Sequence, residues 1–242
     1  MKYLAPMDLL ADKIILVTGA GDGIGKVAAM TYAKHGATVI LLGRTTQKLE
    51  KVYDEIIAEK GAQPAIYPMN LEGASPKDYA DLANTLDTEF GALHGVLHNA
   101  AMLGAAAPIQ HHDIDLWYKV MQINVNAPFL MTRALLPLLK KSRDARIVFT
   151  TDDKDQAYWG AYGVSKTAAM GLMKILADEL NTAENPVRVN AVMPGPVRTR
   201  MRARAFPGEN PNTLKTPDEI MSAYLYVMGK DIDKTGEIIV AQ

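Results

Sequence analysis

Cysteine is absent from this sequence of 242 residues. Its absence excludes a disulfide scaffold, a thiolate zinc site, an iron–sulfur cluster and a thiol nucleophile. An excess of either charge is also absent, because 26 Lys and Arg face 27 Asp and Glu, for a formal net charge of -1. A chain with so little net charge has no overall electrostatic field that would attract it to nucleic acid or to an anionic membrane. We therefore expect neither kind of partner.

Long apolar runs are missing as well. The most apolar stretch, residues 127–139, is short and contains Arg133, so we expect no membrane-spanning segment. Residues 1–12 are interrupted by Asp8 and Asp12, which is not the pattern of a signal peptide. None of the five histidines follows a metal-ligand spacing such as HExxH, so we expect no metal site. Together these absences indicate a cytoplasmic globular protein without a bound metal.

Short apolar runs alternate with helical patterns along the whole chain. Runs that are apolar at successive positions are typical of strands buried on both faces of a parallel sheet. Seven βα repeats with right-handed crossovers predict a single α/β domain over residues 1–242, a doubly wound three-layer α/β/α sandwich with a mainly parallel seven-stranded sheet. The predicted strands are Lys13–Thr18, Ala37–Gly43, Ala65–Asn70, His94–Ala100, Arg146–Thr151, Val187–Val192 and Gly236–Val240.

Two long helices and one long loop stand out between these strands. Apolar residues at spacings of three and four predict a helix over Leu116–Leu139. A second helix, rich in small residues, is predicted over Tyr162–Leu180. Ser75 followed by Pro76 is typical of a helix N-terminus. Residues 194–217 contain five prolines and no apolar period, so we expect a loop or lid there.

A glycine-rich turn follows the first predicted strand, with the sequence Thr-Gly-Ala-Gly-Asp-Gly-Ile-Gly over residues 18–25. Glycines allow backbone N–H groups to approach a pyrophosphate, and a helix N-terminus adds partial positive charge. The spacing does not match a mononucleotide P-loop, since Ala20 replaces its first glycine and Val27 offers no hydroxyl for magnesium. The alternative is a tight turn that binds no ligand.

Five motifs in this order resemble the short-chain dehydrogenase/reductase family across essentially the whole chain. They are Thr18-Gly19-x-x-x-Gly23-Ile24-Gly25, His98-Asn99-Ala100-Ala101, Ile123-Asn124-Val125, Tyr162-x-x-x-Lys166, and Arg188-Val189-Asn190 leading to Pro194-Gly195. The resemblance implies a Rossmann fold, a nicotinamide cofactor and hydride transfer to or from a small carbonyl or alcohol substrate. It also implies a homodimer or homotetramer formed through the two long helices. The segments Leu97–Ala100, Trp159–Tyr162 and Met201–Pro207 point to a little-characterised bacterial branch, so the resemblance does not imply a particular substrate.

The end of the second predicted strand indicates which cofactor would bind. In dinucleotide folds an acid there binds the ribose 2′-hydroxyl, but this sequence has Gly43 followed by Arg44 and Thr45. A guanidinium can make bidentate contacts with a 2′-phosphate, so we expect NADP(H). Asp22 weighs slightly against this choice, because it adds negative charge near the pocket. The alternative role of Arg44 is to cap a sheet edge.

The resemblance assigns further cofactor contacts position by position. Asn70 stands where the family has an acid for the adenine amino group, and its amide oxygen can accept the same hydrogen bond. Asn99 is expected to fix the backbone near the cofactor. The full expected set is Gly19, Gly21, Asp22, Gly23, Ile24, Arg44, Thr45, Asn70, Leu71, Asn99, Ala100, Tyr162, Lys166, Pro194, Gly195, Val197 and Thr199.

Tyr162 and Lys166 are the candidate reaction centre. They lie four residues apart on one predicted helix and so share a face. A free phenol titrates near about 10, and an ammonium about 4 Å away at a dielectric of about 20 would stabilise the phenolate by roughly 4 kcal/mol, or about three pK units. The phenol would then exchange a proton with a carbonyl or an alcohol during hydride transfer. By resemblance, Lys166 also binds the nicotinamide ribose and Asn124 holds a proton-relay water.

The family's substrate-orienting serine is missing. Counting along the fifth strand places Asp152 at its position, only ten residues before Tyr162, in a loop shorter than usual. One interpretation is that the register shifts and Thr151 supplies the hydroxyl of an active reductase. The other is that Asp152 faces the substrate oxygen, opposes phenolate formation and leaves a catalytically impaired NADP(H)-binding protein that acts as a sensor or interaction module. We favour the first, although strand alternation puts Thr150 and Asp152 on one face.

Two other groups of residues carry hypotheses. Arg198, Arg200, Arg202 and Arg204 in the expected lid form either a solvated basic loop or a recognition site for an anionic substrate or the cofactor phosphate. His98 is expected to be a buried, hydrogen-bonded imidazole rather than a catalyst.

Overall fold

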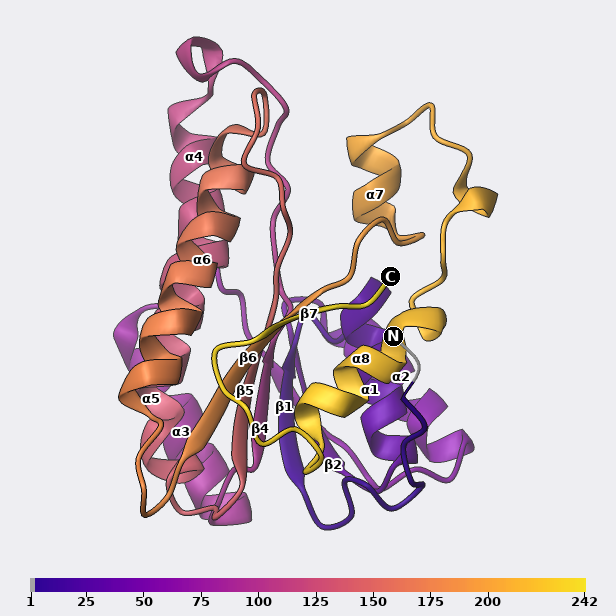
Figure 1. Cartoon of the computed structure of the whole chain (residues 1–242), viewed down its shortest axis with the longest axis vertical. Helices are drawn as coiled ribbons and strands as arrows, with labels where there is room; N and C mark the ends of the chain where they lie inside the picture. Colours follow the sequence, from indigo (N-terminus) through magenta and orange to yellow (C-terminus); the bar gives the residue numbers. More distant parts are fainter. Residues whose placement is uncertain (1–2) are drawn as a thin grey trace.

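A single parallel sheet organises the computed structural model, which describes residues 3–242 (Figure 1). Within these residues the sheet has seven strands in the order β3-β2-β1-β4-β5-β6-β7, and every neighbouring pair is parallel. The predicted fold class is confirmed, and each predicted strand overlaps an observed one. The strands are β1 (Ile14–Thr18), β2 (Thr38–Gly43), β3 (Ala65–Pro68), β4 (Gly95–His98), β5 (Ala145–Thr150), β6 (Val187–Met193) and β7 (Ile238–Val240).

Helices cover both faces of the sheet because its strands are apolar on both sides. One core packs α1, α2 and α8 against the sheet, and a second core packs α3, α5 and α6 on the other face. Figure 1 shows these two layers to the right and left of the strands. The helices are α1 (Gly23–Lys34), α2 (Thr46–Ala58), α3 (Pro76–Phe90), α4 (Ile114–Met121), α5 (Ala127–Leu139), α6 (Gly160–Glu179), α7 (Arg200–Ala205) and α8 (Met221–Met228).

The strand order reverses between β1 and β4, and this is the point at which open α/β sheets bind ligands. The Thr18 hydroxyl joins the two strand ends: it donates to Leu97 O (3.1 Å) and accepts from the N–H groups of Asn99 (2.9 Å) and Ala100 (3.0 Å). The Thr18 side chain thereby ties the carboxyl ends of β1 and β4 together at this edge of the sheet.

The structure corrects the predicted helix over Leu116–Leu139. It is divided into α4 and α5 by a π-helical turn at Gln122–Asn126. Such turns insert one residue and often lie at functional sites. The expected loop at 194–217 contains the short helix α7 and a 3₁₀ turn, Pro211–Thr213.

The predicted start of α3 is confirmed: Ser75 and Asp78 form a capping box with Pro76 in the first turn. Two further 3₁₀ segments precede helices, Ile109–His111 before α4 and Asp218–Ile220 before α8. Among residues 3–242 no helix has the length and hydropathy needed to cross a membrane. No group of three or more His, Asp or Glu in the same residues is placed to hold a metal ion.

Candidate active site

The glycine turn lies at the N-terminus of α1, against the end of β4. Gly19 has φ +69, and a Cβ there would lie 3.1 Å from Ala100 Cα. A Cβ on Gly25 would overlap Gly19 O, so the turn and the helix approach too closely for any side chain. Gly23, with φ +54, faces the Thr199 methyl group. Bare backbone therefore lines the turn, as a pyrophosphate site requires.

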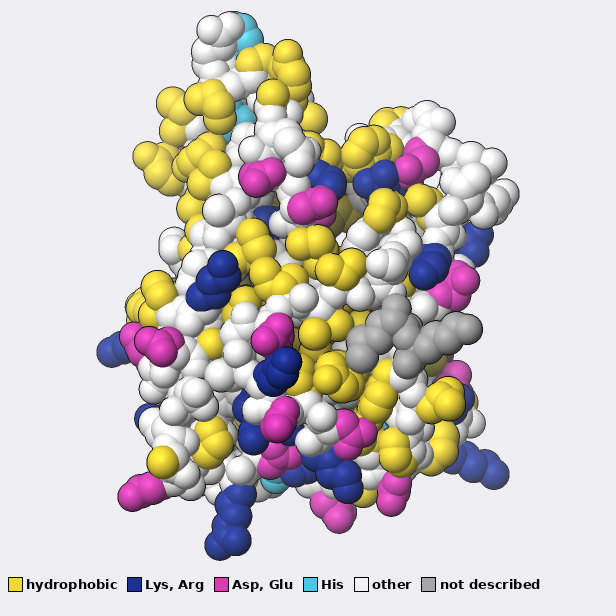
Figure 2. All heavy atoms as spheres, in the orientation of Figure 1, with side chains coloured by type: hydrophobic (Ala, Val, Ile, Leu, Met, Phe, Trp, Pro, Cys, Tyr) yellow, Lys and Arg dark blue, Asp and Glu magenta, His cyan; other side chains and the backbone are white. Residues whose placement is uncertain are grey.

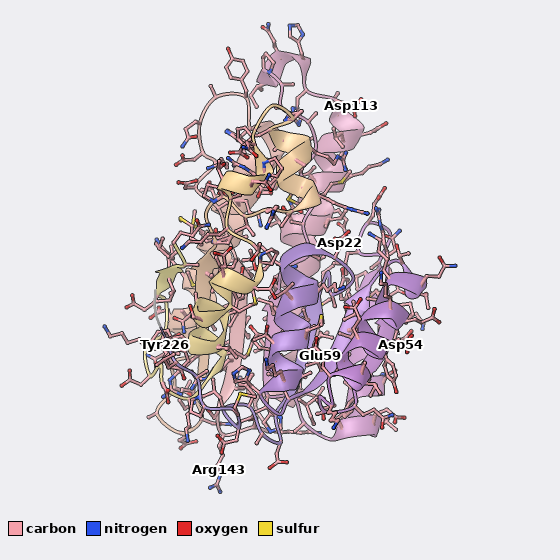
Figure 3. The ribbon with its side chains drawn as sticks, turned by 90° about the vertical axis from the view of Figure 1, so that its right-hand side faces the viewer. Asp22, Asp54, Glu59, Asp113, Arg143 and Tyr226 are labelled. Carbon is pink, nitrogen blue, oxygen red and sulfur yellow. The ribbon has the colours of Figure 1, made fainter. Side chains whose placement is uncertain are left out.

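Asp22 caps α1 and joins three parts of the site. Its Oδ1 accepts from the Gly23 N–H (2.9 Å), and its Oδ2 pairs with Lys48 of α2 (2.8 Å) and with Arg200 of α7 (3.6 Å). Figure 3 shows Asp22 at the upper end of α1, below α7. Partial burial opposes ionisation, but the hydrogen bond and charge of Lys48 lower the pKa of Asp22 below its ordinary value. The negative charge that weighed against NADP(H) is therefore compensated by two cations.

Arg44 and Thr45 follow β2 at the same edge of the sheet. Arg44 is exposed and makes no hydrogen bond or ion pair with any described residue, which contradicts the alternative in which it only caps the sheet. Thr45 occupies the N-cap of α2 without a side-chain cap bond. Asn70, beyond β3, is exposed and accepts from the Glu72 N–H (3.3 Å), while Leu71 is buried beside it. The free guanidinium and hydroxyl at this helix start suit a phosphate.

Asn99 links the cofactor side of the crevice to β5. Its Nδ2 donates to Thr18 O (3.3 Å), and its Oδ1 accepts from the Thr150 hydroxyl (3.3 Å). Asn99 thus fixes the backbone beside the glycine turn, in the position that the resemblance implied. Gly21 and Ile24 complete the turn between β1 and α1.

The segment after β6 closes the crevice from the other side. Pro194 O accepts a hydrogen bond from Gln242 Nε2 (2.6 Å), and a Cβ on Gly195 (φ +68) would meet the same amide at 3.1 Å. Val197 is buried and pairs with Lys215 in an isolated bridge. Thr199 caps α7 by accepting from the Arg202 N–H (3.1 Å) and touches the glycine turn.

Tyr162 lies in the first turn of α6 with only 6% exposure. Its hydroxyl donates to Asp152 Oδ2 at 3.0 Å. Thr151, the favoured supplier of a hydroxyl, is instead buried, and its Oγ1 has no hydrogen-bond partner among the described residues. The structure thus corrects the preference for Thr151 and matches the second interpretation, because the register places the Asp152 carboxylate beside the phenol.

The electrostatics of Tyr162 also differ from the sequence-based expectation. Burial, followed by the charge and hydrogen bond of Asp152, raises the pKa of the Tyr162 phenol far above its ordinary value. Lys166 lies 5.6 Å from the centroid of the Tyr162 ring and donates to Thr150 O (2.9 Å). Burial lowers the pKa of Lys166 to about 8, although Asp152 counteracts part of this effect. The predicted depression of the phenol pKa is therefore wrong for the ligand-free protein: its phenol stays protonated at neutral pH.

Asn124 lies in the π-helical turn, which directs its side chain toward α6. Its Nδ2 donates to Ser165 Oγ (2.9 Å) and to Met102 O (3.0 Å), and its Oδ1 accepts from the Met102 N–H (2.8 Å). Ser165 in turn donates to Tyr162 O (2.7 Å). The π turn thus couples Asn124 to the first turn of α6.

The arginines of the 194–217 segment are mostly engaged with protein groups. Arg202 makes a bidentate ion pair with Glu209 (2.7 Å for both bonds) and stacks on Phe206, 3.7 Å from the ring centroid. Phe206 and Tyr162 each contact the Trp159 ring at 5.8 Å between centroids. Arg202 therefore braces the segment after α7, while Phe206 contacts the reaction centre through Trp159, a structural role that neither hypothesis for the basic loop included.

Several residues of the site were missing from the sequence-based set. Thr18 and Thr150 tie the strand ends together, Ser165 positions Asn124, and Arg200 reaches Asp22. Thr18 is a named residue of a quoted motif, so that motif offered a signal, whereas Ser165 stands at an unspecified position of its motif. Arg200 could not be singled out among neighbouring arginines. His98 is buried, as expected, with Nε2 2.8 Å from Thr132 Oγ1, and burial lowers its pKa to about 3.

Comparison with known proteins identifies the family. A match to the short chain dehydrogenase family spans residues 13–210. "Uncharacterized oxidoreductase YciK" of Escherichia coli (strain K12) is 48% identical over 246 aligned positions, covering 100% of this chain and 96% of that protein. This chain belongs to the short-chain dehydrogenase/reductase family.

Two solved structures of short-chain dehydrogenases carry a cofactor. One, described as putative, from Shigella flexneri 2a str. 301 and complexed with NADP, is 49% identical with a TM-score of 0.94, covering 98% of this chain and 100% of that one. Another, from Escherichia coli CFT073 and complexed with NADPH, is 49% identical with a TM-score of 0.95 over the same shares. Within the family's short-chain dehydrogenase fold, the Tyr162–Asp152 contact is the feature that distinguishes this reaction centre from the expected serine-containing one.

Proposed function

We propose that this short-chain dehydrogenase/reductase is an NADP(H)-dependent oxidoreductase that reduces the carbonyl of a small molecule or oxidises the corresponding secondary alcohol. The observation that carries the proposal is the placement of Tyr162, Lys166 and Asn124 beside a bare glycine turn with a free Arg44. Two structures of relatives at 49% identity were determined with NADP and NADPH, which supports the same cofactor here.

The residues of the crevice fit this cofactor. Cβ atoms at Gly19 and Gly25 would collide with neighbouring protein atoms, so the turn can pack this closely only with glycine, and the α1 N-terminus favours the charge of a pyrophosphate. Arg44 is free for a 2′-phosphate, and Asp22 is already paired with Lys48. When bound, the nicotinamide supplies or accepts hydride. Asn99, Lys166 and the 194–199 segment would orient it.

The chain's own residues handle the proton. Because the pKa of Tyr162 is raised, its phenol is protonated at neutral pH and can act as an acid toward a carbonyl oxygen. Lys166, with a pKa of about 8, carries most of its positive charge at neutral pH and stabilises the phenolate that remains. Alcohol oxidation needs the phenolate at the start, so the raised pKa of Tyr162 suits the phenol to the proton-donating direction at neutral pH.

The test is NADPH-dependent reduction of a panel of ketones and aldehydes by the parent protein and the Tyr162→Phe variant. Loss of the proton donor is expected to lower kcat/KM by about 10²–10⁴-fold while the Kd for NADPH changes little. Turnover that survives Tyr162→Phe would remove Tyr162 from the mechanism.

A second candidate function rests on the Tyr162–Asp152 hydrogen bond itself. A carboxylate that accepts a hydrogen bond from the phenol opposes phenolate formation and repels a developing alkoxide. The chain would then bind NADP(H) and act as a sensor or interaction module with weak turnover. Tight NADPH binding without reduction of any carbonyl in the panel is the outcome that favours this candidate.

We also propose that the protein forms a homodimer or homotetramer through α4, α5 and α6. Large apolar side chains are exposed on these helices: Ile114 (69%), Tyr118 (67%), Phe129 (49%), Val164 (45%) and Ile175 (58%). Figure 2 shows hydrophobic side chains gathered on the upper left of the molecule, where Figure 1 places α4 and α6. Apolar surface of this kind favours association between copies.

A further inference from the structure

Asp152 lies in the reaction centre, but its carboxylate has no role in the reduction of a neutral ketone. Its Oδ2 accepts a hydrogen bond from the Tyr162 hydroxyl at 3.0 Å, and its side chain keeps 26% exposure. A carboxylate accepts hydrogen bonds and, unlike a hydroxyl, donates none to a substrate oxygen. The position therefore suits a substrate group that donates, and above all one that is positively charged.

No nearby hydroxyl takes the place of the missing donor. Thr150 donates to Asn99 Oδ1 (3.3 Å) and lies 3.1 Å from the Tyr224 hydroxyl. The Thr151 hydroxyl is buried out of reach of a substrate. The Tyr162 hydroxyl makes its hydrogen bond to the Asp152 carboxylate, so a substrate atom that reaches the phenol lies next to that carboxylate.

The charges around Asp152 favour a cation. Its loop, residues 152–155, contains three Asp and one Lys, a net charge of -2. Lys154 lies 3.5 Å from Asp152 Oδ1 but pairs more closely with Asp153. Asp152 Oδ2 makes no ion pair among the described residues and accepts from Tyr162, although the charge of Asp152 also acts on the buried Lys166. On the opposite wall Arg202 is neutralised by Glu209. Figure 2 shows a hollow between the upper end of α6 and α7, with acidic and basic side chains on both sides.

We infer that the substrate is a ketone with an ammonium group on the carbon next to the carbonyl, or the matching vicinal amino alcohol. This inference rests on the proposed function and names its substrate class. The ammonium pairs with Asp152 and neutralises the carboxylate that holds the phenol proton. Oxygen and nitrogen on adjacent carbons then face Tyr162 Oη and Asp152 Oδ2, which are themselves one hydrogen bond apart at 3.0 Å.

The reaction balances with the cofactor class already proposed. The carbonyl carbon gains hydride, with its electron pair, from a reduced nicotinamide that is oxidised in the process. The carbonyl oxygen gains the proton of Tyr162, so a C–H and an O–H bond form, and the ketone becomes an alcohol. The resulting phenolate lies beside Lys166 and recovers its proton from solvent. A neutral ketone, in contrast, leaves the proton shared with Asp152.

The test compares ketones that differ only by an ammonium in place of a methyl group: aminoacetone against 2-butanone, and α-aminoacetophenone against propiophenone. With NADPH, the parent protein is expected to show at least about a tenfold higher kcat/KM for the charged ketone of a pair, the size of one charge-assisted hydrogen bond. Asp152→Asn, which keeps shape but removes charge, is expected to abolish that preference. Asp155→Asn, which removes an exposed charge of the same loop that forms no ion pair with Lys154, is expected to leave it within about twofold.

A binding measurement without cofactor gives a second readout. Ligand-observed NMR is expected to detect 1-amino-2-propanol on the parent protein and about tenfold weaker binding on Asp152→Asn, with no such difference for 2-butanol. Equal or better turnover of the uncharged ketones, or no turnover of either pair by protein that binds NADPH, overturns the inference. Failure to bind NADPH would instead contradict the proposed function.

Discussion

At the scale of single residues, burial decides the protonation of the reaction centre. Lys166 lies in the interior, and desolvation lowers its pKa from the ordinary 10.5 to about 8. Tyr162 is buried as well and donates to a carboxylate, so its pKa moves upward. Both shifts favour the neutral form of the group, as burial requires. Burial of the Lys166 ammonium therefore lowers the free energy of unfolding, while it places a cation near the proton donor Tyr162.

This cost predicts the effect of Lys166→Met. The lowered pKa of Lys166 means that burying its charged form destabilises the folded protein by about 3 kcal/mol at neutral pH. The variant removes this penalty, but it also loses the hydrogen bond to Thr150 O, which offsets about half of the gain. Lys166→Met is expected to raise the free energy of unfolding at pH 7 by about 1–2 kcal/mol while abolishing turnover. Between pH 8 and 10.5 Lys166 is more protonated in the unfolded state than in the folded state, so the parent protein gains stability as the pH rises. The difference in unfolding free energy between the variant and the parent therefore shrinks over this range. Urea denaturation at about pH 7 and about pH 10 checks this, and a variant less stable at neutral pH contradicts it.

Arg44 carries the second prediction at this scale. Its guanidinium is exposed and unpaired among the described residues, so it can bind a 2′-phosphate without first losing a hydrogen bond or an ion pair. Arg44→Gln is expected to raise the Kd for NADPH by about 10–100-fold, the worth of a charge-assisted contact, and to leave the Kd for NADH nearly unchanged. Fluorescence titration with both nucleotides measures this. An equal loss for both would show that Arg44 supports the fold of the crevice instead.

The sequence allowed most of these residues to be placed, but not their protonation. The glycine turn, Asn99, Asn124, Tyr162 and Lys166 lie together as the motif order predicts. The choice between Thr151 and Asp152 depended on the register of a short loop, which strand alternation alone does not determine. The raised pKa of Tyr162 depends on burial and on the same contact with Asp152. The spacing of Tyr162 and Lys166 in the sequence was therefore not enough to predict the direction of the shift.

At the scale of elements, the loop that carries Asp152 packs closely against Gly163 of α6. A Cβ on Gly163 would overlap Lys154 O and lie 3.1 Å from Trp159 Cβ. Gly163→Ala is therefore expected to push the loop off the helix, destabilise the protein by about 1–3 kcal/mol and separate Asp152 from Tyr162. Thermal unfolding and the tyrosine-dependent activity report the two effects.

The same helix offers the matched control. A Cβ on Gly171 would meet no atom of the described residues within 4 Å, so Gly171→Ala should stabilise α6 by about 0.5–1 kcal/mol. Equal behaviour of the two variants would argue that helix propensity, rather than contact with the loop, explains the effect at position 163.

Element prediction failed at one informative place. Apolar spacing extends without a break through residues 116–139, so nothing in the pattern separates a π turn from an α-helix at Gln122–Asn126. The turn is stabilised by bonds from Asn124 to the Met102 backbone and to Ser165, which are distant in sequence. Strands were predictable because their apolar runs are local, whereas the turn depends on tertiary contacts.

At the scale of the whole molecule, one end of the sheet holds the chemistry and one outer layer remains apolar. The glycine turn, Asp152 and α7 all lie at the carboxyl edge, the end that Asp113 marks in Figure 3, while Arg143 marks the opposite end. The helices α4, α5 and α6 form the layer that carries the exposed apolar side chains. Because α6 also carries Tyr162 and Lys166, association through this layer would rigidify the catalytic helix.

That arrangement predicts an oligomer that one charge can disrupt. The parent is expected to sediment at a multiple of 26.4 kDa. Ile175→Glu, on the exposed face of α6, is expected to shift it to the monomer, because a charge buried at an apolar contact costs several kcal/mol. Ile57→Glu provides the control, since Ile57 is similarly exposed (43%) on α2 at the other face of the sheet. Sedimentation velocity distinguishes the outcomes, and a monomeric parent at micromolar concentration would refute the interface.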